Sequence, residues 1–148
     1  MALDTHLPIG EVLDDLTAAL RTHTSAVLVA EPGAGKTTVV PLALLDETWC
    51  TGKVIVVEPR RVAARAAASR LAEQLRERPG GTVGWRMRGD TKIGARTRIE
   101  VVTDGVLTRM LHKVPPPVMN SVFKSSPPNA QLVTSSLGTG TKSISLPS

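Results

Sequence analysis

The segment from Ser25 to Leu45 constrains the fold more than any other part of the chain. It begins with the apolar run SAVLVA, passes through the glycine-containing stretch EPGAG, and continues as KTT followed by apolar residues. A short apolar run with valines, bounded by Gly and Pro, is typical of a buried parallel strand. The residues from about Gly35 onward predict a helix. A strand that turns tightly into a helix in this way indicates an α/β sheet.

The turn between that strand and that helix matches a phosphate-binding loop, AEPGAGKTT, over Ala30 to Thr38. Such a loop directs consecutive backbone N–H groups inward and leads into the positive end of a helix dipole. Gly33 and Gly35 allow a phosphate to approach the backbone closely, Lys36 is placed to bridge the β and γ phosphates, and Thr37 is placed to hold Mg²⁺. We predict a nucleotide site formed by Gly33, Ala34, Gly35, Lys36, Thr37 and Thr38.

Ala30 departs from this pattern, because the usual first residue of the loop is glycine. Alanine is sterically acceptable at a negative φ, since only a positive φ penalises its Cβ. The alternative interpretation is a plain glycine turn, but G-K-T between a strand and a helix favours the phosphate loop.

The same alternation of strand and helix continues downstream to Lys113. The expected elements are a helix at Glu11–Arg21 within an N-terminal segment of residues 1–24, strands at Lys53–Glu58, Thr82–Met87 and Arg98–Thr103, and helices at Arg61–Arg76 and Asp104–Lys113. With 148 residues, one domain is expected. We therefore predict that residues 25–113 form a parallel sheet flanked by helices.

Residues 114–148 have a different composition. They hold six of the eleven prolines, eight serines and no Asp or Glu, and they show no apolar periodicity. This composition predicts a disordered tail.

Basic residues concentrate in residues 60–98, which contain eleven Arg or Lys against three Asp or Glu. All but Lys92 are arginine, whose forked guanidinium matches phosphate geometry. An ordinary solvated surface is the alternative, but a nucleotide loop upstream favours contact with nucleic acid.

Several classes of protein fit poorly. Cys50 is the single cysteine, so no disulfide can form within the chain, and a reducing compartment is expected. The apolar run Val39–Leu45 is too short to span a bilayer, and the first residues do not resemble a signal peptide. The three histidines are scattered, which argues against a metal cluster. We expect a cytoplasmic protein with no membrane segment.

The residues after the loop carry a resemblance to a known family. VVEPRRVAARAAASRLAEQL, followed by VGWRMRGDTKIGARTRIEVVTDGVLTRML, resembles the first motor domain of the DEAH/RHA group of superfamily-two helicases, most closely the bacterial HrpB type. The resemblance extends from about Leu7 to Lys113. It implies a RecA-like P-loop NTPase fold, ATP with Mg²⁺ as cofactor, and RNA or DNA as partner.

Three motifs carry this resemblance. GKTT with the following Pro41 is similar to motif I, EPRRVAAR to motif Ia and VTDGVLTRML to motif Ib, while Trp85 stands where the family has tyrosine in V-G-Y-x-x-R. The resemblance implies that nucleic acid contacts Arg60, Arg61, Thr103, Asp104 and Gly105.

The position of PRR agrees with this assignment on physical grounds. A strand that ends in PRR places two guanidiniums at the carboxyl edge of a parallel sheet, where such sheets bind ligands. Arg60 and Arg61 also lie at the N-terminal end of the expected helix, and cations at that end oppose the helix dipole. An external anion is therefore favoured as their partner.

One expected part of the family pattern is missing. The family places an acidic box, which holds Mg²⁺ and the attacking water, soon after motif Ib, yet no Asp or Glu follows Asp104. The expectation is an incomplete motor domain that binds nucleotide weakly, hydrolyses it very slowly and does not unwind alone. A frameshift or truncation near Lys113 is a hypothesis that explains the change.

Two other functions remain open. One is a nucleic-acid-binding module that responds to ATP without hydrolysing it. The other is a P-loop kinase or transferase, although such an enzyme gives no reason for the P-R-R and T-D-G motifs. The motifs do not distinguish RNA from DNA, because they contact the backbone, and the oligomeric state is not indicated.

Overall fold

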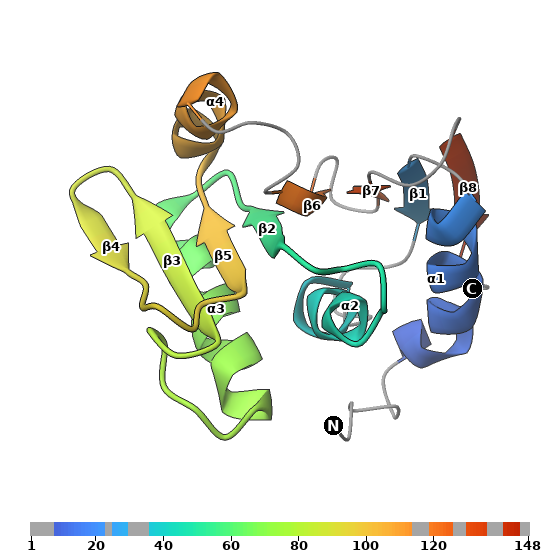
Figure 1. Cartoon of the computed structure of the whole chain (residues 1–148), viewed down its shortest axis with the longest axis horizontal. Coiled ribbons are helices and arrows are strands. Elements are labelled where there is room, and N and C mark those ends of the chain that lie inside the picture. The colour runs from blue at the N-terminus through green and yellow to red at the C-terminus, as the bar shows by residue number, and fades with distance from the viewer. Residues whose placement is uncertain are drawn as a thin grey trace.

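The computed structural model describes residues 8–22, 25–29, 36–113, 119–125, 130–135 and 141–145. Its elements alternate between helix and strand through most of the chain (Figure 1). In order they are η1 Pro8–Val12, α1 Leu13–Thr22, β1 Ser25–Val29, α2 Lys36–Leu45, β2 Lys53–Val57, α3 Arg61–Gln74, β3 Val83–Met87, β4 Asp90–Lys92, β5 Ile99–Val102, α4 Asp104–Lys113, β6 Met119–Ser125, β7 Ala130–Ser135 and β8 Thr141–Ser145.

The strands form one eight-stranded sheet in the order β4-β3-β5-β2-β6-β7-β1-β8. Strand β5 lies parallel to both β2 and β3, while β4 pairs antiparallel with β3. Strand β6 is parallel to β2, and β7 is antiparallel to both β6 and β1, so β1 and β2 point the same way. The predicted α/β fold with a largely parallel sheet is confirmed, and the carboxyl ends of β1, β2, β3 and β5 lie at one edge.

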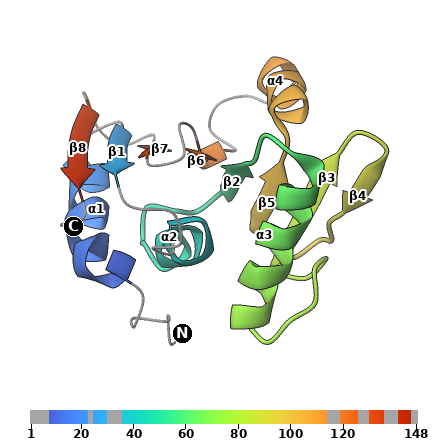
Figure 2. The same ribbon diagram turned by 180° about the vertical axis from the view of Figure 1, so that it is seen from behind.

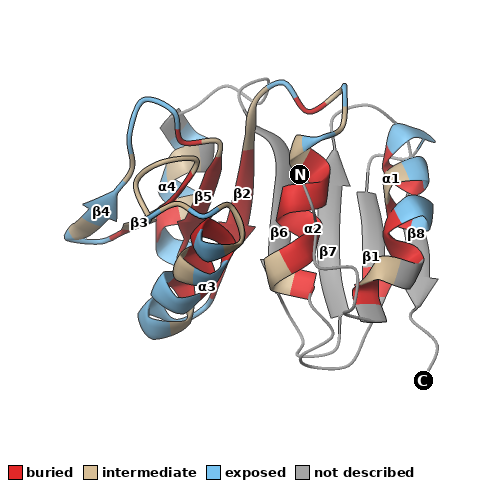
Figure 3. Cartoon of the chain, turned by 90° about the horizontal axis from the view of Figure 1, so that it is seen from below, coloured by how far each residue is buried: buried red, intermediate tan, exposed pale blue. Residues whose placement is uncertain are grey.

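Helices α1, α2 and α3 pack on one face of this sheet, and α4 lies on the other (Figures 2 and 3). The first face holds the larger apolar core, in which Leu16, Leu42 and Leu71 are fully buried, one from each helix. Apolar positions at helical spacing on α1 and α3 produce this burial. The sequence-based prediction of these helices and their apolar stripes is confirmed.

The opposite face carries a smaller apolar cluster. Ile55, Val57 and Val102 of the sheet pack there against Val106 of α4. Since successive strand residues point to opposite faces, the apolar residues of β2 and β5 supply both clusters, with Glu100 of β5 the one charged residue among the buried positions.

The hairpin β3–β4 contains a strand that the sequence did not reveal. Strand β4 is short and polar, so it has no apolar alternation. Two glycines shape the hairpin. A Cβ at Gly84 would lie 2.2 Å from the Lys92 carbonyl oxygen, and Gly89 adopts φ +73° in the turn. At Gly84 only glycine permits the close approach, and at Gly89 glycine adopts the positive φ without the steric cost of a Cβ.

Three segments of residues 114–148 are described as strands. Strand β6 pairs with β2, β7 pairs with β6 and β1, and β8 pairs with β1. The composition of these residues contains no pattern that forms an apolar core. The unpaired N–H and C=O groups at a strand edge can nevertheless form hydrogen bonds with a polar segment. Among the described residues the sheet has eight strands, and β6, β7 and β8 are three of them.

Candidate functional site

The phosphate-loop prediction falls partly on described residues. Ala30, Gly33, Ala34 and Gly35 lie outside them. Helix α2 begins at Lys36, which is buried, and Thr37 and Thr38 in its first turn are half-buried. A buried ammonium at the start of a helix, beside backbone N–H groups, suits the binding of a phosphate anion.

Helix α3 contacts the first turn of α2 through a polar side chain. The Gln74 Nε2 amide donates to the Thr38 carbonyl oxygen at 2.7 Å. This bond joins the end of the helix that begins at Arg61 to the start of the helix that begins at Lys36. No pattern in the sequence indicates this bond, because a glutamine near the end of a helix is an ordinary surface residue.

The second and third motifs meet at the carboxyl edge of the sheet. Val57 and Val102 are register partners in the parallel pair β2–β5, and the Glu58 N–H donates to the Val102 carbonyl oxygen at 2.9 Å. The residues that follow each strand, Arg60–Arg61 and Thr103–Gly105, therefore lie at the same edge of the sheet, although the helices that they begin lie on opposite faces. The chain order alone separates them by about forty residues.

Arg60 is the N-cap of α3, with φ −123° and ψ 140°, and its side chain makes no capping hydrogen bond. Its carbonyl oxygen accepts the Ala64 N–H at 2.9 Å. Arg60 and Arg61 are both exposed. Two cations thus stand at the positive end of a helix, an arrangement that a bound anion would stabilise.

Helix α4 begins with the opposite charge. The Thr103 carbonyl oxygen accepts the N–H groups of Val106 and Leu107 at 3.0 Å each. Asp104 occupies the first turn, where an acidic side chain stabilises the helix dipole. At Gly105 an added Cβ would meet nothing within 4 Å, so packing within the described structure does not require glycine there.

Glu58 is a buried carboxyl group between the two motifs that the sequence reasoning did not single out. It is 9% exposed at the end of β2. Burial raises the pKa of Glu58, because the charged form loses solvation. Its position directly after four apolar strand residues is the feature of the sequence that could have indicated its burial.

A carboxylate in the β3–β4 hairpin ties that hairpin to α3. Asp90 accepts the Trp85 indole N–H at 3.0 Å and the Arg65 Nε–H at 2.8 Å, and Arg65 forms an ion pair with it. The hydrogen bond from Trp85, followed by that from Arg65, lowers the pKa of Asp90. The Lys92 ammonium lies 5.5 Å from the Trp85 ring centroid, a cation–π contact.

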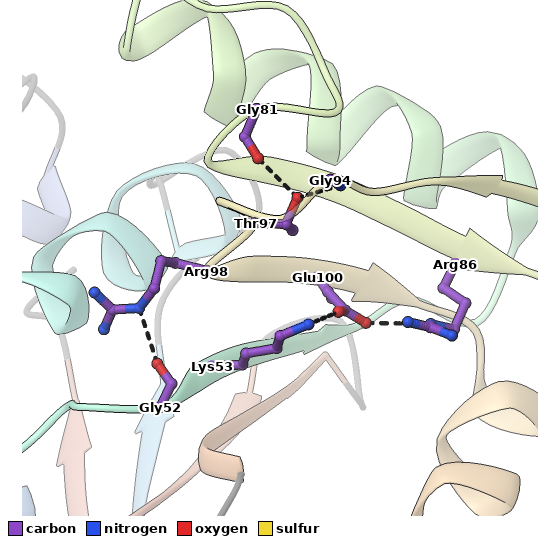
Figure 4. A network of polar contacts seen from close by, with 8 residues as sticks. All are labelled: Gly52, Lys53, Gly81, Arg86, Gly94, Thr97, Arg98 and Glu100. Atoms are coloured by element: carbon purple, nitrogen blue, oxygen red, sulfur yellow. Dashed lines mark hydrogen bonds and ion pairs between the residues drawn. The ribbon is translucent and has the colours of Figure 1, made fainter.

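A buried carboxylate also organises the face that α4 covers (Figure 4). Glu100 is 1% exposed and pairs with Lys53 of β2 and, at 3.3 Å, with Arg86 of β3. The Arg98 guanidinium donates to the Gly52 and Cys50 carbonyl oxygens at 3.0 and 2.6 Å. Ionic contacts therefore link three adjacent strands on this face.

Within the described residues, no helix is long and apolar enough to cross a membrane. Among those same residues, no group of three or more His, Cys, Asp or Glu side chains is arranged to hold a metal ion.

No protein-family model matches the chain. Its sequence is 52% identical over 109 residues to the ATP-dependent RNA helicase HrpB of Escherichia coli strain K12. The matched region covers 74% of this chain and 14% of HrpB. The chain is 34% identical over 103 residues to the ATP-dependent RNA helicase HrpA of the same organism, covering 69% of this chain and 8% of HrpA. The chain thus spans a small part of the length of both relatives.

A solved structure agrees with this relationship. The crystal structure of the Escherichia coli DEAH/RHA helicase HrpB is similar to the chain with a TM-score of 0.75 at 49% sequence identity. The match covers 80% of this chain and 15% of the HrpB chain. The sequence comparison and the structural comparison therefore both identify HrpB as a relative of this chain.

Proposed function

We propose, on the premise that this chain belongs to the DEAH/RHA group of helicases over the region matched, that it binds ATP and the backbone of single-stranded RNA. The observation that supports the proposal is that Arg60–Arg61 and Thr103–Gly105 follow two adjacent parallel strands at the carboxyl edge of the sheet. RNA is preferred over DNA because the matched relatives are named RNA helicases.

ATP would occupy the start of α2. The residues present fit a triphosphate, since Lys36 is buried at the helix N-terminus and Thr37 and Thr38 are half-buried in the first turn. We assign Lys36 to the phosphates and the Thr37 hydroxyl to Mg²⁺, with Gly33, Ala34 and Gly35 supplying backbone N–H groups. When bound, ATP supplies the free energy for a change in strand affinity.

Single-stranded RNA would lie along the carboxyl edge. The exposed guanidiniums of Arg60 and Arg61 would bind backbone phosphates without regard to sequence. Thr103 and Asp104 offer polar groups beside them, and Gly105 lets a strand approach the backbone of α4 because no Cβ stands there. The Gln74–Thr38 bond joins the last residue of α3, at the other end of the helix from Arg61, to the first turn of α2.

Binding without efficient hydrolysis is part of the proposal. No Asp or Glu follows Asp104, so the sequence offers no acidic box after motif Ib to position an attacking water. The chain would then act as an ATP-responsive binding module, and unwinding belongs to the longer helicases that it resembles. A cytoplasmic location is proposed with it, since Cys50, the one cysteine, is a buried free thiol, as expected in a reducing compartment.

The test is a pair of titrations on the full chain, one with a non-hydrolysable ATP analogue and Mg²⁺ and one with a twelve-residue oligouridylate. Lys36→Ala should abolish analogue binding, and Arg60→Gln with Arg61→Gln should weaken the oligonucleotide by about tenfold or more and reduce its salt dependence. Arg70→Gln, an exposed arginine further along α3, is the matched control. Unchanged oligonucleotide affinity in the double variant would overturn the assignment of the edge.

Gly105→Ala separates a functional glycine from a structural one. The added methyl meets nothing within 4 Å, so the thermal melt should stay close to that of the unmodified chain apart from a small helix-propensity change. Oligonucleotide affinity should fall if a strand approaches this backbone. Equal affinity in both proteins would remove Gly105 from the proposed interface.

A further inference from the structure

Gln74 is the last residue of α3, and its side chain lies against the first turn of α2. Helices α2 and α3 pack on the same face of the sheet and share its apolar core (Figures 2 and 3). The Gln74 Nε2 amide donates to the Thr38 carbonyl oxygen at 2.7 Å. A polar side chain of one helix therefore holds the backbone of the other beside an apolar core.

The oxygen of the same amide is left without a partner. Gln74 Oε1 is buried and accepts no hydrogen bond from the part of the chain that the structure describes. Most buried polar atoms in proteins are hydrogen-bonded, and one that is not loses its solvation without compensation. Half of the Gln74 amide therefore lowers the stability of the fold.

Packing alone does not explain a glutamine at this position. An unbranched apolar side chain of similar length, such as methionine, would fill the space without burying an unpaired oxygen. A residue that sacrifices stability while it holds a neighbouring element in place is expected at a functional position. The element that Gln74 holds is the helix at which the nucleotide is proposed to bind.

The first turn of α2 has fewer helical bonds than an ordinary first turn. Pro41 lies inside α2. Proline has no N–H, so the helical hydrogen bond from residue 41 to the Thr37 carbonyl oxygen cannot form. The Gln74 amide adds a bond to this turn from outside the helix.

This turn carries the two side chains assigned to the phosphates and to Mg²⁺. Lys36 is buried at the start of α2, and Thr37 follows it, half-buried. Groups that bind a phosphate or a metal ion depend on neighbouring hydrogen bonds for their orientation. A bond to the Thr38 backbone fixes the chain directly after these two residues.

We propose that Gln74 is a positioning residue of the nucleotide site. Its amide N–H holds the Thr38 backbone and so keeps Lys36 and Thr37 directed toward the phosphates and Mg²⁺. The role rests on the proposed function, because it requires a nucleotide at the start of α2.

The experiment compares Gln74→Met with the unmodified full chain. Methionine has a similar length but no amide. Glu73→Met makes the same new side chain at the neighbouring exposed position of α3 and is the matched control. Each protein is titrated with a non-hydrolysable ATP analogue and Mg²⁺ and with a twelve-residue oligouridylate, and its thermal melt is recorded.

Gln74→Met should bind the analogue about tenfold more weakly while melting at the same or a higher temperature, because the unpaired oxygen is gone. Its oligonucleotide affinity should equal that of Glu73→Met, since Arg61 lies at the opposite end of α3. A lower melting temperature with both affinities reduced would show a purely structural role and overturn the proposal.

A double-mutant cycle tests whether Gln74 acts through this turn. Thr37→Val removes the proposed Mg²⁺ ligand and keeps the size of the side chain. With that ligand gone its orientation no longer matters, so Gln74→Met should weaken analogue binding less in the Thr37→Val background than in the unmodified chain. Equal fold losses in both backgrounds would overturn the positioning role.

The outcomes also separate this role from the nucleotide site itself. Analogue affinity in Gln74→Met equal to that of the control, with Lys36→Ala abolishing binding, overturns the role of Gln74 and leaves the site standing. No analogue binding by the unmodified chain overturns the site, and the role of Gln74 with it.

Discussion

The two faces of the sheet are built from the same strands but serve different purposes. The face under α1, α2 and α3 is almost wholly aliphatic, with fully buried side chains from every helix. The face under α4 has a small apolar cluster, a buried Glu100 with two cationic partners, and a pocket with three arginines. Apolar packing on the face under α1, α2 and α3 stabilises the fold, so the face under α4 can hold charged side chains.

Within the β3–β4 hairpin, acidic and basic side chains lie on opposite faces of the sheet. Asp90 faces α3, while Arg86 faces Glu100 and α4. Neighbouring strand residues point to opposite sides, so alternation alone separates a carboxylate from the guanidiniums that it would otherwise neutralise.

The largest expected effect is a cavity in the aliphatic face. Leu71→Ala removes a fully buried side chain and should lower the free energy of unfolding by about 2–5 kcal/mol, measured by chemical denaturation. Leu107→Ala, on the α4 face and only partly buried, is the matched control and should cost clearly less. Equal losses would contradict the view that the first face dominates stability.

The next effect comes from the close approach of the β3–β4 hairpin. Gly84→Ala would place a Cβ 2.2 Å from the Lys92 carbonyl oxygen, a backbone atom that cannot move cheaply. The expected cost is about 1–3 kcal/mol, and the wall of the arginine pocket should shift with it. Gly89→Asn tests the turn instead, and its cost should be smaller because asparagine tolerates a positive φ. An unaffected melt in Gly84→Ala would contradict the close contact.

Removing the buried charge of Glu100 on the α4 face should lower the free energy of unfolding less than the cavity made by Leu71→Ala. Glu100→Gln keeps the size of the side chain but loses both ion pairs, and Lys53 and Arg86 are 36% and 39% exposed, so water can solvate them. A loss of about 1–2 kcal/mol is expected, smaller at high salt. Lys53→Gln should cost less than Glu100→Gln, since it leaves Glu100 with Arg86. A salt-independent loss would count against an ionic origin.

The smallest effect has the opposite sign. Burial raises the pKa of Glu58 in the folded chain, so the folded state binds its proton more tightly than the unfolded state. Stability therefore falls as the pH rises from the ordinary glutamate pKa through the raised value. Glu58→Gln should be more stable than the unmodified chain above this window, and the difference should vanish below it. Thermal melts across this pH range measure it, and a constant difference would exclude ionisation as the cause.

Much of the fold could be predicted from local pattern. The apolar runs of β1, β2 and β5 and the helical stripes of α1, α3 and α4 are strong periodic signals, and all six elements are present near the predicted bounds. Strand β4 was missed because DTK has no apolar residue, and its pairing depends on Gly84 allowing close approach. No local pattern in residues 114–148 indicates which strands β6, β7 and β8 pair with, because their partners β1 and β2 lie far away in the chain.

The candidate site was predictable in kind but not in arrangement. Lys36, Arg60 and Asp104 stand out by motif, and their roles remain predictions for the experiments above. Glu58 and Glu100 did not stand out, because burial of a carboxyl group depends on what packs against it and not on its neighbours in sequence.

The phosphate-loop pattern, the order of strands and helices and the membership of the helicase family can all be read from the sequence, because they depend on residue type and local spacing. Only the tertiary structure shows that β2 and β5 end side by side, with Arg60–Arg61 and Thr103–Gly105 following them, and that Asp90 pairs with Arg65. Strand pairing and side-chain direction set those relations. They arise from contacts between residues far apart in the chain, which no local pattern encodes.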